Sequence, residues 1–207
     1  MARSAAQTPQ GEPTVCDVIA IAASAGGLAA LSAVLSELKP DLPAAVLVVQ
    51  HMDPQHPSHL AEIIGRRVSL QVKQAAQHEK IKPGTVYFAV PNRHLLLNPD
   101  GRITLSDTPA VHFVRPAADL LFESVAKSCG ARSMVVILSG SGTDGADGAT
   151  AVKKAGGTVI VQDQETAEFF SMPRAAIETG SVDQILPLSG IADAVVRFLD
   201  ELAGSPR

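Results

Sequence analysis

The sequence predicts an α/β domain: a doubly wound, mostly parallel sheet with helices on both faces and an antiparallel hairpin excursion. Short apolar runs bounded by turn residues recur along the chain, as expected for strands buried on both faces. Helix-compatible stretches separate these runs, which indicates alternating strands and helices. A middle section carries Pro-Asn and Pro-Asp-Gly turns instead, and these favour hairpins.

The elements follow in order along the chain. Residues 1–14 are polar with Pro and Gly, and we expect a disordered tail or linker there, with the domain occupying 15–207. Buried strands are expected at 18–22, 44–49, 133–138 and 158–161, and helices at 28–38, 57–66, 117–128, 146–154 and 190–202. The hairpin excursion is expected to use 84–90, 94–98 and 102–106.

Composition limits the function classes. The 207 residues are 46% hydrophobic and 18% charged, which suits one α/β domain with a sizeable core. The net charge of −4 gives no electrostatic footprint for nucleic acid. No apolar run approaches the roughly 20 residues of a membrane span, and the N-terminus has no secretory apolar region. Cys16 and Cys129 form no CxxC motif, so we expect reduced thiols and a cytoplasmic protein without membrane insertion.

Ser24 is the strongest catalytic candidate. It follows an apolar run and precedes Ala25, Gly26 and Gly27, after which a helix is expected at once. A hydroxyl is thereby expected at the carboxyl end of a strand, beside the amides of a helix N-terminus, which can stabilise an oxyanion. The alternative is a small turn that only lets helix and sheet pack closely.

His51 and Asp144 complete a possible triad. His51 follows the next expected strand, and Asp144 lies in the Gly-rich turn after another. Sites of doubly wound sheets form at this edge, and Ser, His and Asp are the groups of a hydrolase triad. The order Ser–His–Asp and the missing Gly-x-Ser-x-Gly motif argue against an ordinary α/β-hydrolase.

The same Gly-rich turn supports a competing interpretation. Gly140 to Gly145 reads Gly-Ser-Gly-Thr-Asp-Gly, a literal Gly-x-Gly-x-x-Gly between a strand and a helix. Asp163 follows about 20 residues later, where a ribose-binding acid of a dinucleotide-binding oxidoreductase belongs. Against it, Asp144 places a negative charge inside the phosphate cradle, and Ser24 and His51 are left without roles.

A metal site is not expected. His51, His56 and His59 lie close in sequence, but prolines interrupt their spacing and no cysteine pair accompanies them. We therefore expect neither a metal nor a cofactor.

Six short stretches together resemble one family. The chain is similar to the catalytic domain of the chemotaxis protein-glutamate methylesterase (CheB) family, in family order over about residues 17–200. The matching stretches are 21–27 (Ile-Ala-Ala-Ser-Ala-Gly-Gly), 49–52 (Val-Gln-His-Met), 91–95 (Pro-Asn-Arg-His-Leu), 115–124 (Arg-Pro-Ala-Ala-Asp-Leu-Leu-Phe-Glu-Ser), 142–145 (Gly-Thr-Asp-Gly) and 172–177 (Met-Pro-Arg-Ala-Ala-Ile).

The resemblance implies a serine esterase that hydrolyses glutamyl methyl esters on chemoreceptor cytoplasmic helices, and in some members also deamidates receptor glutamines. It implies Ser24 as nucleophile, His51 as base and Asp144 as orienting acid, with no cofactor. We expect the oxyanion to meet amides near Ala25, Gly26, Ser141 and Gly142, and Arg115 to contact the substrate. Asp119 and Glu123 are expected to be ordinary charges on a helix face.

Three departures from the family pattern qualify these expectations. Ala25 stands where many members have threonine, and Ser141 stands where many have methionine. The 14 residues before the domain cannot encode the receiver domain of typical members, so we expect either a stand-alone form or regulation by another protein, for which a separate receiver protein is the candidate. A catalytically quiet relative that binds receptors or signalling proteins is the remaining alternative.

Overall fold

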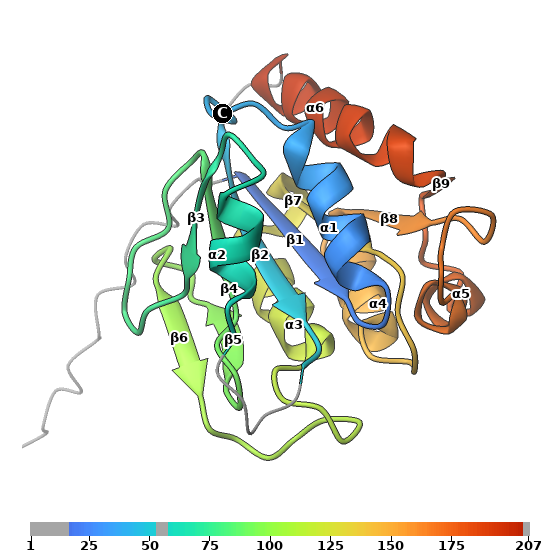
Figure 1. The fold of residues 1–207 in the computed structure, drawn as a ribbon, viewed down its shortest axis with the longest axis horizontal. Coiled ribbons are helices and arrows are strands. Elements are labelled where there is room, and N and C mark those ends of the chain that lie inside the picture. The colour runs from blue at the N-terminus through green and yellow to red at the C-terminus, as the bar shows by residue number, and fades with distance from the viewer. Residues whose placement is uncertain (1–16, 53–57, 205–207) are drawn as a thin grey trace, which may run out of the picture.

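The structure is a computed structural model that describes residues 17–52 and 58–204 (Figure 1). The predicted tail at 1–14, Cys16 and His56 lie outside the described residues. The strands of the main sheet run in the order β3-β4-β2-β1-β7-β8-β9, and every pairing between neighbours is parallel. The predicted doubly wound α/β architecture is therefore confirmed.

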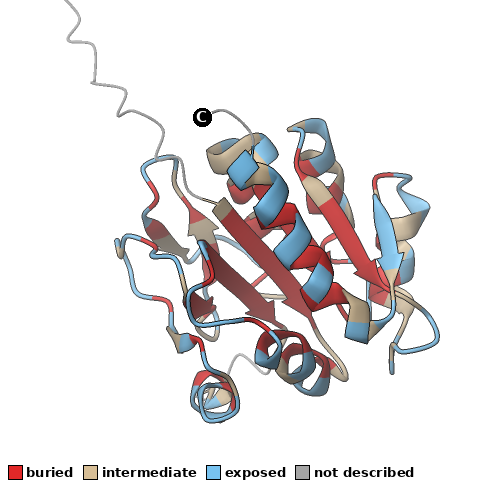
Figure 2. Cartoon of the chain, turned by 90° about the horizontal axis from the view of Figure 1, so that it is seen from above, coloured by how far each residue is buried: buried red, intermediate tan, exposed pale blue. Residues whose placement is uncertain are grey.

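The central strands follow the predicted apolar runs. They are β1 (Asp17–Ala23), β2 (Ala44–Gln50), β7 (Ser133–Ile137) and β8 (Thr158–Gln162). Their interior side chains are almost all buried, because helices cover both faces of the sheet (Figure 2). Since β2 and β7 lie on opposite sides of β1, the chain reverses its direction of winding beside β1. This is where sheets of this kind open a crevice at the carboxyl ends of their strands.

The helices divide between the two faces. The face with Ile19 and Ile21 packs against α1 (Gly27–Ser36), α2 (Leu60–Gly65) and α6 (Leu188–Gly204). The face with Ala20 and Ala22 packs against α3 (Ala118–Cys129), α4 (Ala146–Lys154) and α5 (Ser171–Glu178). A short 3₁₀ turn, Gly130–Arg132, links α3 to β7. None of the helices in the described ranges has the length and apolar character needed to cross a lipid bilayer.

The predicted hairpin excursion is only partly right. β5 (His94–Leu97) and β6 (Ile103–Ser106) form the expected antiparallel pair. In contrast, β4 (Thr85–Phe88) pairs with β2 in the parallel sheet, and all four of its residues are buried, as is typical of an interior strand. Two further strands, β3 (Gln71–Gln74) and β9 (Gln184–Leu186), were not predicted and form the edges of the sheet.

Candidate active site

Ser24 is the first residue after β1, in a turn whose two glycines have no room for a side chain. Its amide donates to the carbonyl of Ser139 (3.0 Å), which joins the turns that follow β1 and β7. Gly26 has φ 74°, and a Cβ there would lie 2.7 Å from Ser139 Oγ. A Cβ at Gly27 would lie 2.1 Å from Gln50 Oε1. Glycine is therefore required at both Gly26 and Gly27 by the close approach of neighbouring side chains.

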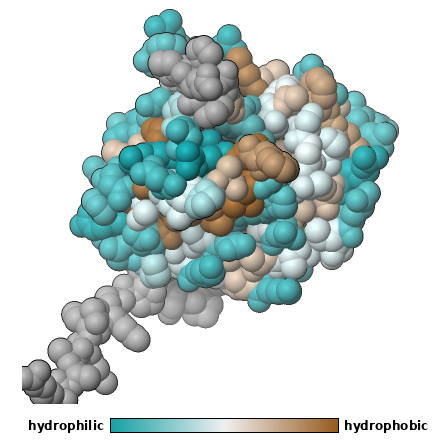
Figure 3. Space-filling view, turned by 90° about the horizontal axis from the view of Figure 1, so that it is seen from below, coloured by the Kyte–Doolittle hydropathy of each residue, from teal (hydrophilic) through white to brown (hydrophobic). Residues whose placement is uncertain are grey.

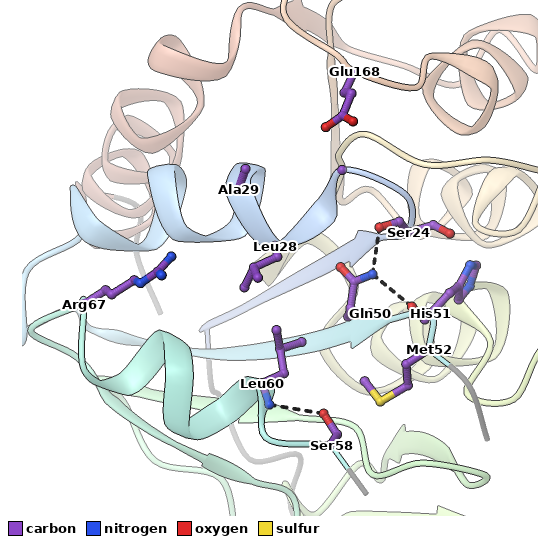
Figure 4. Close-up of a pocket in the computed structure, with 11 residues that line it drawn as sticks. Ser24, Leu28, Ala29, Gln50, His51, Met52, Ser58, Leu60, Arg67 and Glu168 are labelled. Atoms are coloured by element: carbon purple, nitrogen blue, oxygen red, sulfur yellow. Dashed lines mark hydrogen bonds between the residues drawn. The ribbon is translucent and has the colours of Figure 1, made fainter. Parts of the chain in front are cut away.

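His51 follows β2 and is fixed beside the serine turn. Its amide donates to the carbonyl of Ala23 (3.0 Å), so the ladder between β1 and β2 continues up to the site. The side-chain amide of Gln50 donates to the carbonyls of both Ser24 (2.8 Å) and His51 (3.0 Å) (Figure 4). Gln50 thus holds the two strand ends at a set spacing, a role that the sequence analysis missed.

Asp144 orients the His51 ring. Its Oδ2 lies 2.7 Å from His51 Nε2, and the two side chains are only 3% and 11% exposed. The amides of Ala118 and Asp119, at the start of α3, donate to the same carboxylate at 2.6 and 3.0 Å. Burial would raise the pKa of Asp144, but the hydrogen bonds from His51 and from these two amides outweigh it and lower the pKa. Asp144 is accordingly a carboxylate able to stabilise an imidazolium.

Asp119 is a second buried carboxyl group behind Asp144. It is 3% exposed, and its Oδ1 accepts the amides of Gly145 (2.9 Å) and Gly148 (2.8 Å) at the start of α4. Asp144 therefore caps α3, which carries Asp119, and Asp119 caps α4, which begins two residues after Asp144. Burial raises the pKa of Asp119 from 3.8 to about 6, opposed by the Gly148 amide and reinforced by the Asp144 charge. The expectation that Asp119 is an ordinary charge on a helix face is wrong.

Ser24 and His51 face a common cavity of about 600 Å³. Gln50 lies between them, and Met52, Leu28 and Leu60 supply apolar walls, as the close-up in Figure 4 shows. Glu168 and Arg67 lie at its margin. A hydroxyl, an imidazole and a mostly apolar space thus meet at the carboxyl edge of the sheet.

Comparison with known proteins identifies the family of the chain. A family model described as CheB methylesterase matches residues 19–195. The chain belongs to the CheB methylesterase family. The catalytic domain of the Thermotoga maritima CheB methylesterase has a similar fold, with a TM-score of 0.85 and 36% identity over 88% of this chain and 98% of that one.

Two curated relatives carry the name protein-glutamate methylesterase/protein-glutamine glutaminase. The protein of the group 3 operon of Rhizobium meliloti is 38% identical over 99% of this chain and 59% of its own length. The protein of Symbiobacterium thermophilum is 40% identical over 94% of this chain and 54% of its own length. The chain therefore spans somewhat more than half the length of these relatives.

The predicted oxyanion donors differ in their availability. Within residues 17–52 and 58–204, the amides of Ala25, Gly26 and Ser141 have no hydrogen-bond acceptor. The amide of Gly142 donates to Ser171 Oγ (3.2 Å), so it is already engaged. The turn after β1 is therefore the better supported source of donors to an oxyanion.

Arg115 is held by its own loop and by Asn92, which lies between β4 and β5. Its guanidinium donates to Asn92 Oδ1 at 3.0 and 2.6 Å and to the carbonyls of Asp107 and Thr108, each at 3.0 Å. It lines a second cavity, of about 200 Å³, together with His51 and Met52. Substrate contact by Arg115 stays a prediction, while its role in fixing the loop is visible.

The dinucleotide interpretation is not supported. The amides of Gly140 and Gly142 donate to Phe169 O and Ser171 Oγ, so they are not free to cradle a phosphate. Asp163 accepts the amide and hydroxyl of Thr166 at 2.9 and 2.7 Å. Within this match, Gly140 is required by its close approach to Ser24 and Met172, whereas Gly142 and Gly145 have positive φ angles of 98° and 100° that favour glycine.

Asp119 gives a testable separation of stability from activity. The pKa of Asp119 is 3.8 in the unfolded chain and about 6 in the folded protein. The protonated group therefore stabilises the folded state fully below pH 3.8, and this stabilisation is lost as the pH rises through 6. The ionised group costs up to about 3 kcal/mol at pH 8. Asp119→Asn keeps an oxygen acceptor for Gly145 and Gly148, so we expect higher stability at pH 8, no gain below pH 4, and turnover within about threefold of wild type.

Asp119→Ala is the matched comparison. It leaves the Gly145 and Gly148 amides without their acceptor, at a cost of about 1–3 kcal/mol for each buried donor, and loosens the turn that carries Asp144. We expect at least a tenfold loss in kcat. Chemical denaturation at pH 4 and pH 8 and ester turnover measure both effects. Equal stability losses at pH 8 for the two variants contradict the assignment.

Proposed function

We propose that the chain is a serine esterase that hydrolyses glutamyl methyl esters on chemoreceptor cytoplasmic domains. The observation that carries the proposal is the 2.7 Å pair of His51 Nε2 and Asp144 Oδ2, with His51 lining the same cavity as Ser24. Family membership supports the substrate class. Since the proposed substrate domains are cytoplasmic, we place the reaction in the cytoplasm.

Each proposed step uses one group of the site. In the proposed tautomer, Nε2–H of His51 donates a hydrogen bond to Asp144 Oδ2. Nδ1 of His51 is then unprotonated and accepts the proton of the Ser24 hydroxyl. Ser24 Oγ attacks the ester carbonyl, and the amides of Ala25 and Gly26 stabilise the oxyanion. His51 then gives the proton to the methoxy oxygen, which leaves as methanol as the C–O bond breaks, so that Ser24 is acylated. Water hydrolyses this acyl-enzyme with His51 again as the base.

The same groups serve an amide substrate. If a glutamine side chain occupies the ester position, His51 delivers its proton to the amide nitrogen, which leaves as ammonia as the C–N bond breaks. Deamidation therefore needs no additional residue. A separate receiver protein remains our proposed regulator of both reactions.

The test is methanol release from methylated receptor cytoplasmic fragments, with a small glutamyl methyl ester as a second substrate. Turnover of both supports the proposal. If a protein with a native circular dichroism spectrum releases methanol from neither substrate, the proposal is excluded. The alternative of a catalytically quiet relative that binds receptors would then be favoured.

We expect activity to be independent of metal ions. In the described part of the chain, His112, Asp119 and Asp147 are the three ligand-type side chains whose atoms lie within 4.8 Å of one another, and the proposed steps use none of them. Incubation with EDTA is expected to change the rate less than twofold. A large loss that zinc restores contradicts the mechanism.

A further inference from the structure

The loop between β6 and α3 contains a tight turn with unusual residues. Val111 and Val114 exchange backbone hydrogen bonds of 3.1 and 2.9 Å, so His112 and Phe113 form the tip of a two-residue turn. Their φ angles are 48° and 66°. Turns of this kind use Gly, Asn or Asp at both tip positions, because a bulky side chain is strained at positive φ. Phenylalanine is therefore a costly choice for the fold.

Burial of the Phe113 ring does not compensate for this strain. It is 103% exposed, whereas the other exposed large apolar side chains in the described ranges reach at most 51%. Removal of a ring from water is the main contribution that phenylalanine makes to stability, and here no such contribution exists. An aromatic side chain that is both strained and fully exposed points to a contact outside this chain.

The turn is anchored on both sides. His112 Nε2 lies 3.3 Å from Oδ2 of the buried Asp119, at ion-pair distance. Arg115 is held by Asn92 and by the carbonyls of Asp107 and Thr108. Phe113 therefore projects from a fixed platform, and little conformational entropy is lost when a partner covers the ring.

The platform lies beside the candidate catalytic site. Phe113 and Arg115 line the cavity of about 200 Å³ that also includes His51 and Met52, and these last two residues line the Ser24 cavity as well. Figure 3 views the molecule from below, the side where Figure 1 places the loop between β6 and α3. Apolar surface there is set among hydrophilic atoms. A small ester in the Ser24 cavity does not cover a ring this exposed, but a protein surface does.

We infer that Phe113 is a docking anchor for the protein substrate: its ring packs on the apolar side chains of the receptor helix next to the modified glutamate. This inference rests on the proposed function. An exposed aromatic beside an arginine is the type of residue that dominates protein interfaces. Phe113 is a positioning residue for the substrate and takes no part in bond making or breaking.

The test is Phe113→Gly, a change that the backbone favours because glycine adopts φ 66° without strain. We expect the melting temperature to stay the same or rise. The KM for the methylated receptor fragment is expected to rise about tenfold or more with kcat unchanged, and kcat/KM for a small glutamyl methyl ester to change less than twofold. Phe113→Trp keeps an aromatic ring and is expected to retain the wild-type KM.

Ile185→Ala is the matched control, because Ile185 is an apolar side chain that is 51% exposed on the edge strand β9. This substitution is expected to leave kcat and KM for both substrates unchanged. Binding of the methylated fragment to Ser24→Ala, with and without Phe113→Gly, tests the inference independently of turnover. An unchanged dissociation constant, absence of fragment binding to the parent, or equal KM increases for both substrates overturns it. Failure of the proposed function is distinct, since it appears as absent methanol release by wild type.

Discussion

Ser24→Ala is expected to reduce ester hydrolysis by about 10⁴-fold or more while the fold survives. The loss is large because the hydroxyl is the only side chain in the proposed mechanism that forms a covalent bond to the substrate. The fold is expected to survive because the turn uses the backbone of Ser24. The amide bonds Ser139, the carbonyl bonds Gly27 and Gln50, and alanine keeps all three contacts.

Ser36→Ala is the control for Ser24. Ser36 is an exposed serine on α1 whose hydroxyl bonds only the Ala33 carbonyl in the described structure, so its loss is expected to leave turnover within twofold. Methanol release from a receptor fragment measures turnover, and circular dichroism with thermal melting checks the fold. A folded Ser24→Ala protein with wild-type methanol release rules out Ser24 as nucleophile.

Asp144→Asn is expected to lower kcat by a factor on the order of 10² or more, with little change in KM. Three N–H groups, from His51, Ala118 and Asp119, point at the two carboxylate oxygens. An asparagine amide nitrogen must therefore face at least one of these donors in either orientation. One orientation selects the wrong imidazole tautomer, and the other keeps the tautomer but removes the charge that stabilises the imidazolium.

Asp193→Asn, an exposed carboxylate on α6, is the charge-matched control and is expected to be neutral. Calorimetry with NAD(P) separates the two interpretations of the Gly-rich turn. We expect no binding to wild type or to Asp144→Asn. Micromolar NAD(P) binding together with full esterase activity in Asp144→Asn contradicts the triad and restores the dinucleotide hypothesis.

The sequence was most informative where a long apolar strand leads into a turn with a polar group. Ser24 and His51 each follow such a strand, and Asp144 lies in the turn after a third, so strand-end logic predicts them without any knowledge of pairing. The core strands were predictable for the same reason, since residues buried on both faces produce continuous apolar runs.

The remaining features depend on contacts between distant segments. β3 and β9 are edge strands with exposed or half-buried residues, so they lack the apolar run of a central strand. Asp119 looks like a first-turn acid on an amphipathic helix until α4 is placed against it. From the sequence, Gln50 is only the last residue of a strand. The pairing of β1 with β2 brings its side-chain amide within hydrogen-bond distance of the carbonyls of Ser24 and His51.

The pairing of β1 with β2 has a consequence for how this protein tolerates changes in length. Ala23 is level with Gln50 in the ladder, so the nucleophile and the base are each the next residue beyond a matched pair. One residue inserted or deleted inside either strand displaces its catalytic side chain by about 3.3 Å and turns it to the opposite face. The lengths of β1 and β2 are therefore fixed by the site, whereas the loops between β3 and β6 can lengthen without moving Ser24 relative to His51.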